Sequence, residues 1–243
     1  MLGYRVRAGG PAVDLMPDYL SDVAEVGGEV DALARHNPKA TFTSRGCTRK
    51  CEFCAVPVIE GDLRELRDGE WEPKPVVCDN NLLACSRTHF DEVVDSLKGM
   101  KGVDFNQGLD ARLLTKYHAD RLAELDCPLV RLAWDHIGLE SRVMAAIELL
   151  TAAGFSKSRI KVYVLLGYDD TPEDALYRLQ TLKDHDVFPN PQRYQPLDAL
   201  EKNTYLNSDW SEWEMRRFMK YWSRLIWYWK IPFGEFRHLR SWV

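Results

Sequence analysis

Three cysteines lie close together near the start of the chain, at Cys47, Cys51 and Cys54. Their spacing is C-x₃-C-x₂-C, which puts three thiols on one short stretch. Three thiolates can hold three corners of a cubic iron–sulfur cluster and leave the fourth iron open. An open iron is a chemical site, whereas a fully ligated cluster is mainly an electron carrier. The spacing therefore predicts a [4Fe–4S] cluster with one free coordination position.

A structural zinc site is the alternative for the same residues. Zinc sites favour paired C-x₂-C units, with a second pair further along the chain completing a tetrahedron. Cys51 and Cys54 have no such partner pair, and Cys47 would be a surplus ligand. An electron carrier would need a fourth cysteine nearby. The remaining cysteines are scattered and are expected to be packed, inert thiols: Cys78, Cys85 and Cys127.

Composition and charge set the broad class. With 243 residues the chain can form one large α/β domain or two small ones. A formal charge of −5 argues against a protein that coats nucleic acid without sequence preference, although a local basic patch is compatible with it. No secretory leader or bilayer-spanning apolar run is evident, so we expect a cytoplasmic protein without a membrane partner.

Short apolar, β-branched segments recur along the chain, and their successive starts lie 26 to 35 residues apart. A βαβ unit takes about 30 residues, so this interval predicts repeated strand–helix crossovers. Six units are too few for a closed eightfold barrel; a partial (β/α)₆ barrel is the prediction, and a flat doubly wound sheet is the alternative. The expected strands are Ala40–Ser44, Pro75–Asp79, Gly102–Asn106, Pro128–Trp134, Arg159–Leu166 and Val187–Gln195.

Start and stop signals predict helices between these strands. Thr171 supplies a hydroxyl cap before a proline and two acids, and Thr88 and Ser211 begin capping-box patterns. The run Leu139–Ala153 is expected to be a helix that ends at Gly154.

Polar residues follow five of the expected strands. Because the carboxyl ends of parallel strands gather the active groups of such folds, we expect one polar cavity there. The acids Asp169 and Asp170 are expected to be solvated loop residues that favour the following helix dipole. The polar groups are Asp79-Asn80-Asn81, Asn106-Gln107 with Asp110, Asp135-His136, Gly167–Asp170 and Arg193-Tyr194-Gln195.

Three parts are expected along the chain. Residues 1–38 are predicted to be a loosely structured lead-in that packs on the barrel, residues 39–198 the core barrel, and residues 199–243 a helical, aromatic-rich extension. The charged segment 60–75, which carries two glycines and two prolines, is expected to form a long loop near the cysteines.

Basic and aromatic residues alternate from Ser211 onward. Such interleaving can neutralise and stack single-stranded nucleic acid or nucleotides. The alternative is an amphipathic helix whose apolar face seals the open side of the barrel. The residues at helical spacing that favour this alternative are Trp222, Leu225, Ile226 and Trp229.

The run Ser44-Arg-Gly-Cys-x₃-Cys-x-Phe-Cys-x-Val-Pro57 resembles the signature of the radical S-adenosylmethionine (radical SAM) superfamily. The aromatic Phe53 before the last cysteine is part of the resemblance. The context looks most like the methylthiotransferase and cobalamin-linked branches, whose accessory domains do not fit in this length.

This resemblance implies that the three cysteines bind the cluster and that SAM chelates the fourth iron. It further implies reductive cleavage of SAM to a 5′-deoxyadenosyl radical, which abstracts hydrogen from a substrate. An external low-potential electron donor of the flavodoxin or ferredoxin type would be a partner. By position, the residues implied to contact SAM are Phe53, Asp79, Asn80, Asn81, Asn106, Gln107, Asp110, Asp135, Gly167 and Tyr168.

The substrate is left open by the sequence. One hypothesis is modification of a nucleoside, nucleotide or nucleic acid; another is a radical step on a small molecule or peptide in a biosynthetic pathway. A non-enzymatic hypothesis is an iron–sulfur or zinc protein that binds a partner without turnover. Arg193, Tyr194 and Gln195 are the candidate substrate contacts.

Overall fold

The computed structural model describes residues 6–27, 36–224 and 230–236. The chain divides into two compact units. Unit 1 comprises Met1–Leu109, Tyr117–Pro128 and Pro196–Leu200; unit 2 comprises Asp110–Lys116, Leu129–Gln195 and Glu201–Val243.

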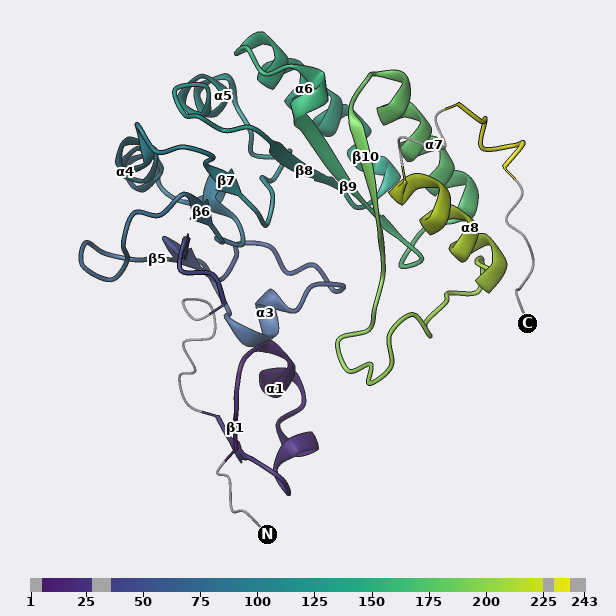
Figure 1. Ribbon diagram of the computed structural model, residues 1–243, viewed down its shortest axis with the longest axis horizontal. Helices are drawn as coiled ribbons and strands as arrows, with labels where there is room; N and C mark the ends of the chain where they lie inside the picture. The colour runs from purple at the N-terminus through teal and green to yellow at the C-terminus, as the bar shows by residue number, and fades with distance from the viewer. Residues whose placement is uncertain (1–5, 28–35, 225–229, 237–243) are drawn as a thin grey trace. The chain divides into compact units, whose positions relative to one another are not determined.

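Short strands dominate unit 1, and longer strands and helices dominate unit 2 (Figure 1). The strands are β1 Arg7–Ala8, β2 Glu25–Val26, β3 Ala40–Thr41, β4 Ser44–Arg45, β5 Arg64–Glu65, β6 Val76–Val77, β7 Asp104–Phe105, β8 Val130–Trp134, β9 Ile160–Leu166 and β10 Phe188–Arg193. The α-helices are α1 Pro11–Leu15, α3 Val56–Ile59, α4 Arg87–Leu97, α5 Lys116–Leu122, α6 Glu140–Ala152, α7 Pro172–Asp184 and α8 Glu212–Ser223.

All six expected strands are present, and all of them pair in parallel. In unit 1 the order is β3-β6-β7, and in unit 2 it is β10-β9-β8. The prediction of an α/β fold with parallel strands is therefore confirmed. Among the residues described, these six strands form two three-stranded sheets, so the hydrogen bonding does not join them into one sheet as the predicted partial (β/α)₆ barrel would.

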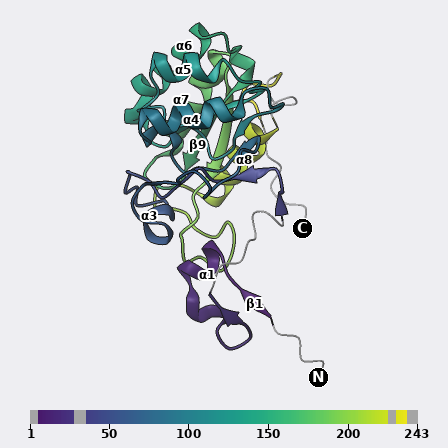
Figure 2. The ribbon, with the colours of Figure 1, turned by 90° about the vertical axis from the view of Figure 1, so that its left-hand side faces the viewer.

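The sheet of unit 2 has one fully buried face. Alternate residues of β9, from Ile160 to Leu166, are completely buried, while Lys161, Tyr163 and Leu165 between them are only partly buried. Helix α6 packs on β8, and α7 packs on β9 and β10 (Figures 1 and 2). Each fully buried aliphatic side chain contributes about 1.5–3 kcal/mol. The core of unit 2 lies between this face and the two helices.

Strand β10 carries two prolines, Pro189 and Pro191, two residues apart. They pair with Val162 and Val164 of β9. Proline has no N–H to donate and is therefore confined to sheet edges. The order β10-β9-β8 places β10 at the edge, as these residues require.

Two of the three helix starts agree with the sequence. Thr171 caps α7: its hydroxyl accepts from Asp174 N at 3.2 Å, and the Asp174 carboxylate accepts from Thr171 N. Ser211 and Glu214 make the same reciprocal pair at the start of α8.

The predicted cap at Thr88 is wrong by two residues. Helix α4 begins at Arg87, and Ser86 is the cap, because its hydroxyl accepts from His89 N at 3.2 Å. Helix α6 ends where predicted, since Gly154 adopts φ +107°, a conformation that favours glycine.

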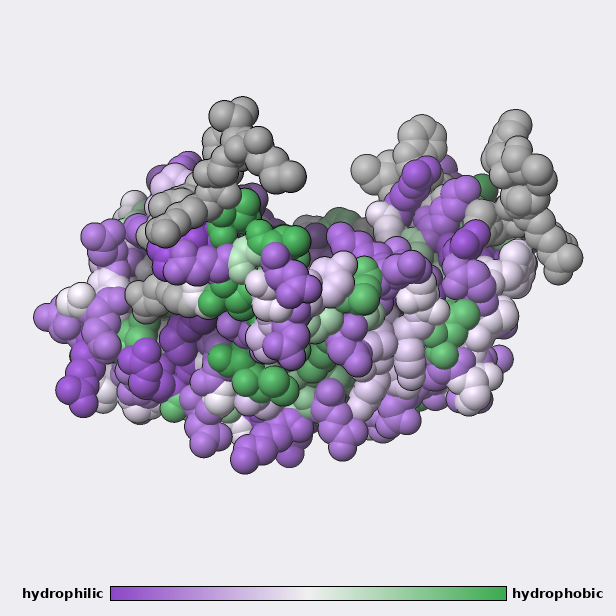
Figure 3. Space-filling view, turned by 90° about the horizontal axis from the view of Figure 1, so that it is seen from below, coloured by the Kyte–Doolittle hydropathy of each residue, from purple (hydrophilic) through white to green (hydrophobic). Residues whose placement is uncertain are grey.

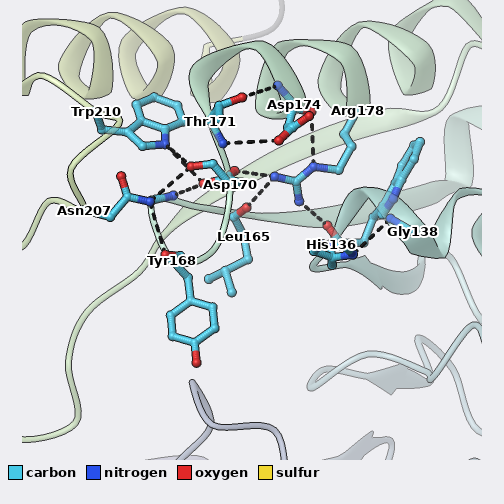
Figure 4. A network of polar contacts seen from close by, with 12 residues as sticks. His136, Gly138, Leu165, Tyr168, Asp170, Thr171, Asp174, Arg178, Asn207 and Trp210 are labelled. Carbon is cyan, nitrogen blue, oxygen red and sulfur yellow. Dashed lines mark hydrogen bonds and ion pairs between the residues drawn. The ribbon is translucent and has the colours of Figure 1, made fainter.

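Asp170 is not the solvated loop acid that the sequence predicts; Asp169 beside it is exposed, but Asp170 is buried. The Asp170 carboxylate forms an ion pair with Arg178 of α7, which is itself completely buried. It also accepts from Gly167 N at 2.7 Å and from Trp210 Nε1 at 3.1 Å (Figure 4). The acid is buried because these donors replace water.

The guanidinium of Arg178 reaches two strands as well as Asp170. It donates to the carbonyl oxygen of Trp134, at the end of β8, at 2.7 Å. It donates to that of Leu165 in β9 at 3.0 Å. One buried cation therefore ties the carboxyl ends of two neighbouring strands to α7.

The N-terminal segment contains more regular structure than predicted. β1 and β2 pair in parallel, and α1 lies between them in the chain. Helix α1 contacts α3, which follows the cysteines. The segment 60–75 also contains a strand, β5, which pairs with β4 immediately before the cysteines.

The C-terminal part is helical and aromatic, as expected. Helix α8 packs on β10, and Trp222 is completely buried. Phe218 and Tyr221 make edge-to-face contacts with Phe233 at 4.7 and 5.0 Å between ring centroids. The other predicted seal residues, Leu225, Ile226 and Trp229, lie outside the described residues.

Figure 3 shows a face of mainly hydrophilic residues, with apolar residues in small groups between them. No helix within the described ranges is long and apolar enough to span a bilayer.

Candidate functional site

The three cysteines lie on the loop between β4 and α3. One residue, Gly46, separates Cys47 from the end of β4. Cys51 and Cys54 share a turn in which Cys54 N donates to the Cys51 carbonyl at 3.0 Å. Phe53 lies in that turn and is partly buried. None of the three cysteines forms a disulfide, and all three are partly exposed. Their thiols are therefore accessible and are not engaged in a disulfide.

Gly46 sets the backbone path into Cys47. It has φ +73°, and a Cβ built there would lie 2.2 Å from the carbonyl oxygen of Asp62. No larger residue fits this position. Gly46 N donates to the Glu60 carboxylate at 2.8 Å, and Arg45 pairs with the same carboxylate at 3.0 Å. Glu60 thus fixes the loop just before the first cysteine.

Asp79 anchors the other side of this loop. Its carboxylate is buried and accepts from Thr43 N at 2.6 Å and from Ser44 Oγ at 2.7 Å, and the Thr43 hydroxyl donates to it as well. Hydrogen bonds to a charged group contribute about 1.5–3 kcal/mol each. The structure therefore gives Asp79 a positioning role, with both oxygens used within the chain.

Asn80 and Asn81 continue the same contact. Asn80 Nδ2 donates to Glu60 at 2.8 Å, and Asn81 Nδ2 donates to the Cys47 sulfur at 3.5 Å. Arg49 N donates to the same sulfur at 3.3 Å. The structure thus brings the predicted Asp79–Asn81 segment directly against the cysteine loop.

These donors suit a thiolate. N–H groups aimed at a cysteine sulfur stabilise its negative charge and tune a metal bound to it. The donor set, three accessible sulfurs on one loop, fits an iron–sulfur group by its chemistry. Within the described residues, however, no three Cys, His, Asp or Glu side chains are close enough to form a metal site. Ligation by the three cysteines therefore stays a prediction from their spacing.

Two other cysteines of unit 1 are poor ligands, as expected. Burial raises the pKa of the Cys85 thiol to about 12. Burial, with the nearby charge of Asp79, also raises the pKa of Cys78, which the Asn106 amide opposes by hydrogen bonding. Both thiols stay protonated at neutral pH, and metal ligation needs the thiolate.

Asn106 and Gln107 follow β7 in unit 1. Asn106 Oδ1 is buried and has no hydrogen-bond partner among the described residues. A buried, unsatisfied amide oxygen is costly, so it marks a position where a ligand donor would be stabilising. Gln107 is exposed.

The other predicted SAM contacts lie in unit 2. Asp110 makes a bidentate pair with Arg112, at 2.7 and 2.9 Å, so its carboxylate is already engaged. Burial raises the pKa of Asp135 at the end of β8, and the charges of Arg112 and Arg178 oppose the shift. Asp135 is thus a partly buried acid at a strand end, as predicted, and is held near two cations.

Gly167 and Tyr168 follow β9. Gly167 has φ +80°, and a Cβ there would lie 2.7 Å from Met215 Cε, so glycine allows α8 to approach. The Tyr168 ring meets that of Tyr194 edge-to-face at 4.8 Å, and Tyr194 meets Tyr205 at 5.0 Å. A predicted cofactor residue and a predicted substrate residue therefore touch.

Arg193 and Gln195 hold the chain that follows β10. Arg193 donates to the Tyr205 carbonyl at 2.9 Å and pairs with Glu212 of α8 at 3.1 Å. Gln195 donates to the Glu201 carbonyl and accepts from Asn203 N. Their side chains organise this loop; contact with a substrate stays a prediction.

Sequence reasoning missed Gly46 and Glu60 as supports of the cysteine loop and Arg178 as a buried cation. The sequence does indicate that Arg178 is buried, since it shares helical spacing with the apolar Ala175, Leu179 and Leu182. No local pattern indicates the role of Glu60, because its contacts are with residues 14 and 20 positions away.

Comparisons with known proteins show a relationship of fold. No family model matches the sequence, and a search of curated proteins found no match. Among solved structures, the chain is similar to TsrM from Kitasatospora setae, a radical S-adenosylmethionine methyltransferase solved with cobalamin and a [4Fe–4S] cluster. The match has a TM-score of 0.51 and 16% identity, and it covers 65% of this chain. This chain spans 38% of that structure, so the likeness is one of fold.

Proposed function

We propose that this protein is a radical SAM enzyme in which Cys47, Cys51 and Cys54 bind a [4Fe–4S] cluster. The observation that carries the proposal is the C-x₃-C-x₂-C run, with Phe53 before its last cysteine, on the loop between β4 and α3. The fold likeness to a radical SAM methyltransferase supports it at the level of architecture.

When bound, such a cluster supplies the low-potential electron that cleaves SAM to methionine and a 5′-deoxyadenosyl radical. The chain's own residues prepare the place. Asn81 Nδ2 and Arg49 N donate hydrogen bonds to the Cys47 sulfur, and the Glu60 carboxylate accepts from Gly46 N just before it. Asp79 holds Thr43 and Ser44, which connect β3 to the loop.

The partner in this reaction is an external low-potential electron donor of the flavodoxin or ferredoxin type, in the cytoplasm. The proposed substrate class is a nucleoside, nucleotide or nucleic acid, from which hydrogen is abstracted. The support is the basic side of the C-terminal part, where Arg216, Lys220 and Arg224 are exposed.

The test is anaerobic reconstitution with iron and sulfide, followed by dithionite and SAM. We expect 5′-deoxyadenosine by liquid chromatography and mass spectrometry, and none from Cys51→Ala. An intact cluster that yields no 5′-deoxyadenosine would refute the catalytic proposal. Deuterium transfer from labelled nucleosides into 5′-deoxyadenosine would then identify the substrate and the position attacked.

A further inference from the structure

A groove of about 710 Å³ runs along one face of α8, entirely within unit 2. One wall comes from Glu212, Arg216 and Lys220, which lie four residues apart and so share a face of α8, and from Arg224, which follows the end of that helix. The facing wall comes from the end of β10 and the loop that Arg193 and Gln195 hold. Pockets for small ligands have volumes of about 300–1,000 Å³.

The charge of the groove is strongly positive in a chain of net charge −5. Five cations line it, and Glu212 is the one carboxylate among its lining residues. Glu212 is already compensated, since it pairs with Arg193 at 3.1 Å and with Arg216 at 2.6 Å. In the part of the chain that is described, Lys202, Lys220 and Arg224 make no ion pair. Three cations therefore remain for a ligand.

Arg193 adds a second, independent indication. Its side chain is 7% exposed and lines the groove. Its Nε is buried and has no hydrogen-bond partner among the described residues, although the other end of the guanidinium is paired. A buried donor of a charged group that has no hydrogen-bond acceptor lowers the stability of the fold. An anion that reached this nitrogen would satisfy it.

We propose that this groove binds a small molecule carrying two or more adjacent phosphates, such as a nucleoside di- or triphosphate. Phosphate oxygens match guanidinium and ammonium donors in charge and geometry. None of the lining residues that the structure describes is aromatic, so this described lining offers no ring on which successive bases of a nucleic acid would stack. The exposed Trp213 is not among these lining residues; its ring centroid lies 5.4 Å from Arg217 Cζ.

The proposal narrows the substrate class suggested above, but its test needs no catalysis. Failure to bind phosphates and failure to form 5′-deoxyadenosine are therefore separate results. The probes are ATP, inorganic tripolyphosphate, adenosine and a 20-nucleotide single-stranded RNA, each titrated calorimetrically against the intact chain.

The variant for the test is Lys220→Ala/Arg224→Ala, because both side chains are exposed and neither makes an ion pair that would support the fold. The matched control is Arg142→Ala/Arg159→Ala, which removes two exposed cations of unit 2 outside the groove. Circular dichroism verifies that both variants are folded.

We expect ATP and tripolyphosphate to bind, and adenosine not to. The groove variant should weaken binding by about tenfold or more, the loss expected when charged hydrogen bonds are removed, and the control should change it less than twofold. Absence of ATP and tripolyphosphate binding, or an equal loss in both variants, would overturn the proposal. RNA binding that is lost in the groove variant, without binding of ATP or tripolyphosphate, would also overturn it and would favour a nucleic-acid surface.

Discussion

The carboxylate of Glu60 accepts a hydrogen bond from the backbone N–H of Gly46 at 2.8 Å. The same carboxylate pairs with Arg45 and accepts from Asn80, so one side chain joins β4, the cysteine loop and the end of β6. The position of Cys47 therefore depends on a residue beyond the last cysteine as well as on the strand before it.

Gly46 and Gly61 form a matched pair for testing this loop, because both have φ +73°. Alanine in a left-handed conformation costs about 1–2 kcal/mol at either position. At Gly46 its Cβ would also meet the Asp62 carbonyl oxygen at 2.2 Å, whereas at Gly61 it meets nothing within 4 Å. We expect Gly46→Ala to lower the urea midpoint of unfolding clearly more than Gly61→Ala and to reduce iron incorporation. Equal effects would contradict the close approach of Asp62.

The cluster ligands are tested by iron and sulfide analysis. Replacing Cys47, Cys51 or Cys54 by alanine should each remove most of the iron retained after anaerobic reconstitution, because three thiolates are the minimum for a cubane site. Cys127→Ala is the control, since Cys127 is buried and is expected to be inert. Full iron retention in any of the three variants would exclude that cysteine as a ligand.

Alkylation of the chain without metal tests the thiol assignment. Burial raises the pKa of Cys85 to about 12, so about one molecule in 10⁴ carries the reactive thiolate there at pH 8. Cys47, Cys51, Cys54 and Cys85 are all partly exposed, so the difference expected between them comes from the raised pKa of Cys85. Iodoacetamide at pH 8, followed by peptide mass spectrometry, should label these three well before Cys85. In urea all six cysteines should label at similar rates. Early labelling of Cys85 in the folded chain would refute its raised pKa.

Removing the buried cation of unit 2 should destabilise the fold. Arg178→Met leaves Asp170 without its charged partner, and breaking a buried pair in this way costs about 3–5 kcal/mol. Arg142→Met, at an exposed residue of α6, should change stability by less than about 0.5 kcal/mol. Urea unfolding followed by circular dichroism measures both variants.

The loss in Arg178→Met should depend on pH. Burial already raises the pKa of Asp170, and the Arg178 charge opposes that shift, so the variant raises this pKa further. A carboxyl with a raised folded pKa stabilises the fold below its unfolded pKa, and that contribution is lost as pH rises through the folded value. The variant's deficit should therefore be smallest in mildly acidic solution and grow toward neutral pH. A deficit independent of pH would show that Asp170 does not ionise there.

The strands could be predicted because local patterns determine them. Six apolar segments with regular spacing became six parallel strands, and the hydroxyls of Thr171 and Ser211 cap helices because a cap needs only residues three positions away. Division into two sheets could not be predicted, since it depends on pairing between residues far apart. Asp170 was misjudged for the same reason: its partners include Trp210, forty residues away.

The candidate site divides in the same way. The cysteine spacing and the location of Asp79–Asn81 at a strand end could be recognised in the sequence, and the structure places that segment against Cys47. The hydrogen bonds from Thr43 and Ser44 to both Asp79 oxygens could not be predicted from the sequence. A carboxylate at a strand end has the same sequence pattern whether it binds a ligand or residues of its own chain.

Pro189 and Pro191 also affect how this protein behaves toward other chains. Both fall at alternate positions of an edge strand, so the outer rim of β10 presents carbonyl groups without the N–H groups that an incoming strand would need. An extended peptide therefore cannot form the regular hydrogen bonds of an added strand along this edge of β10. This edge of unit 2 is protected against self-association by strand addition.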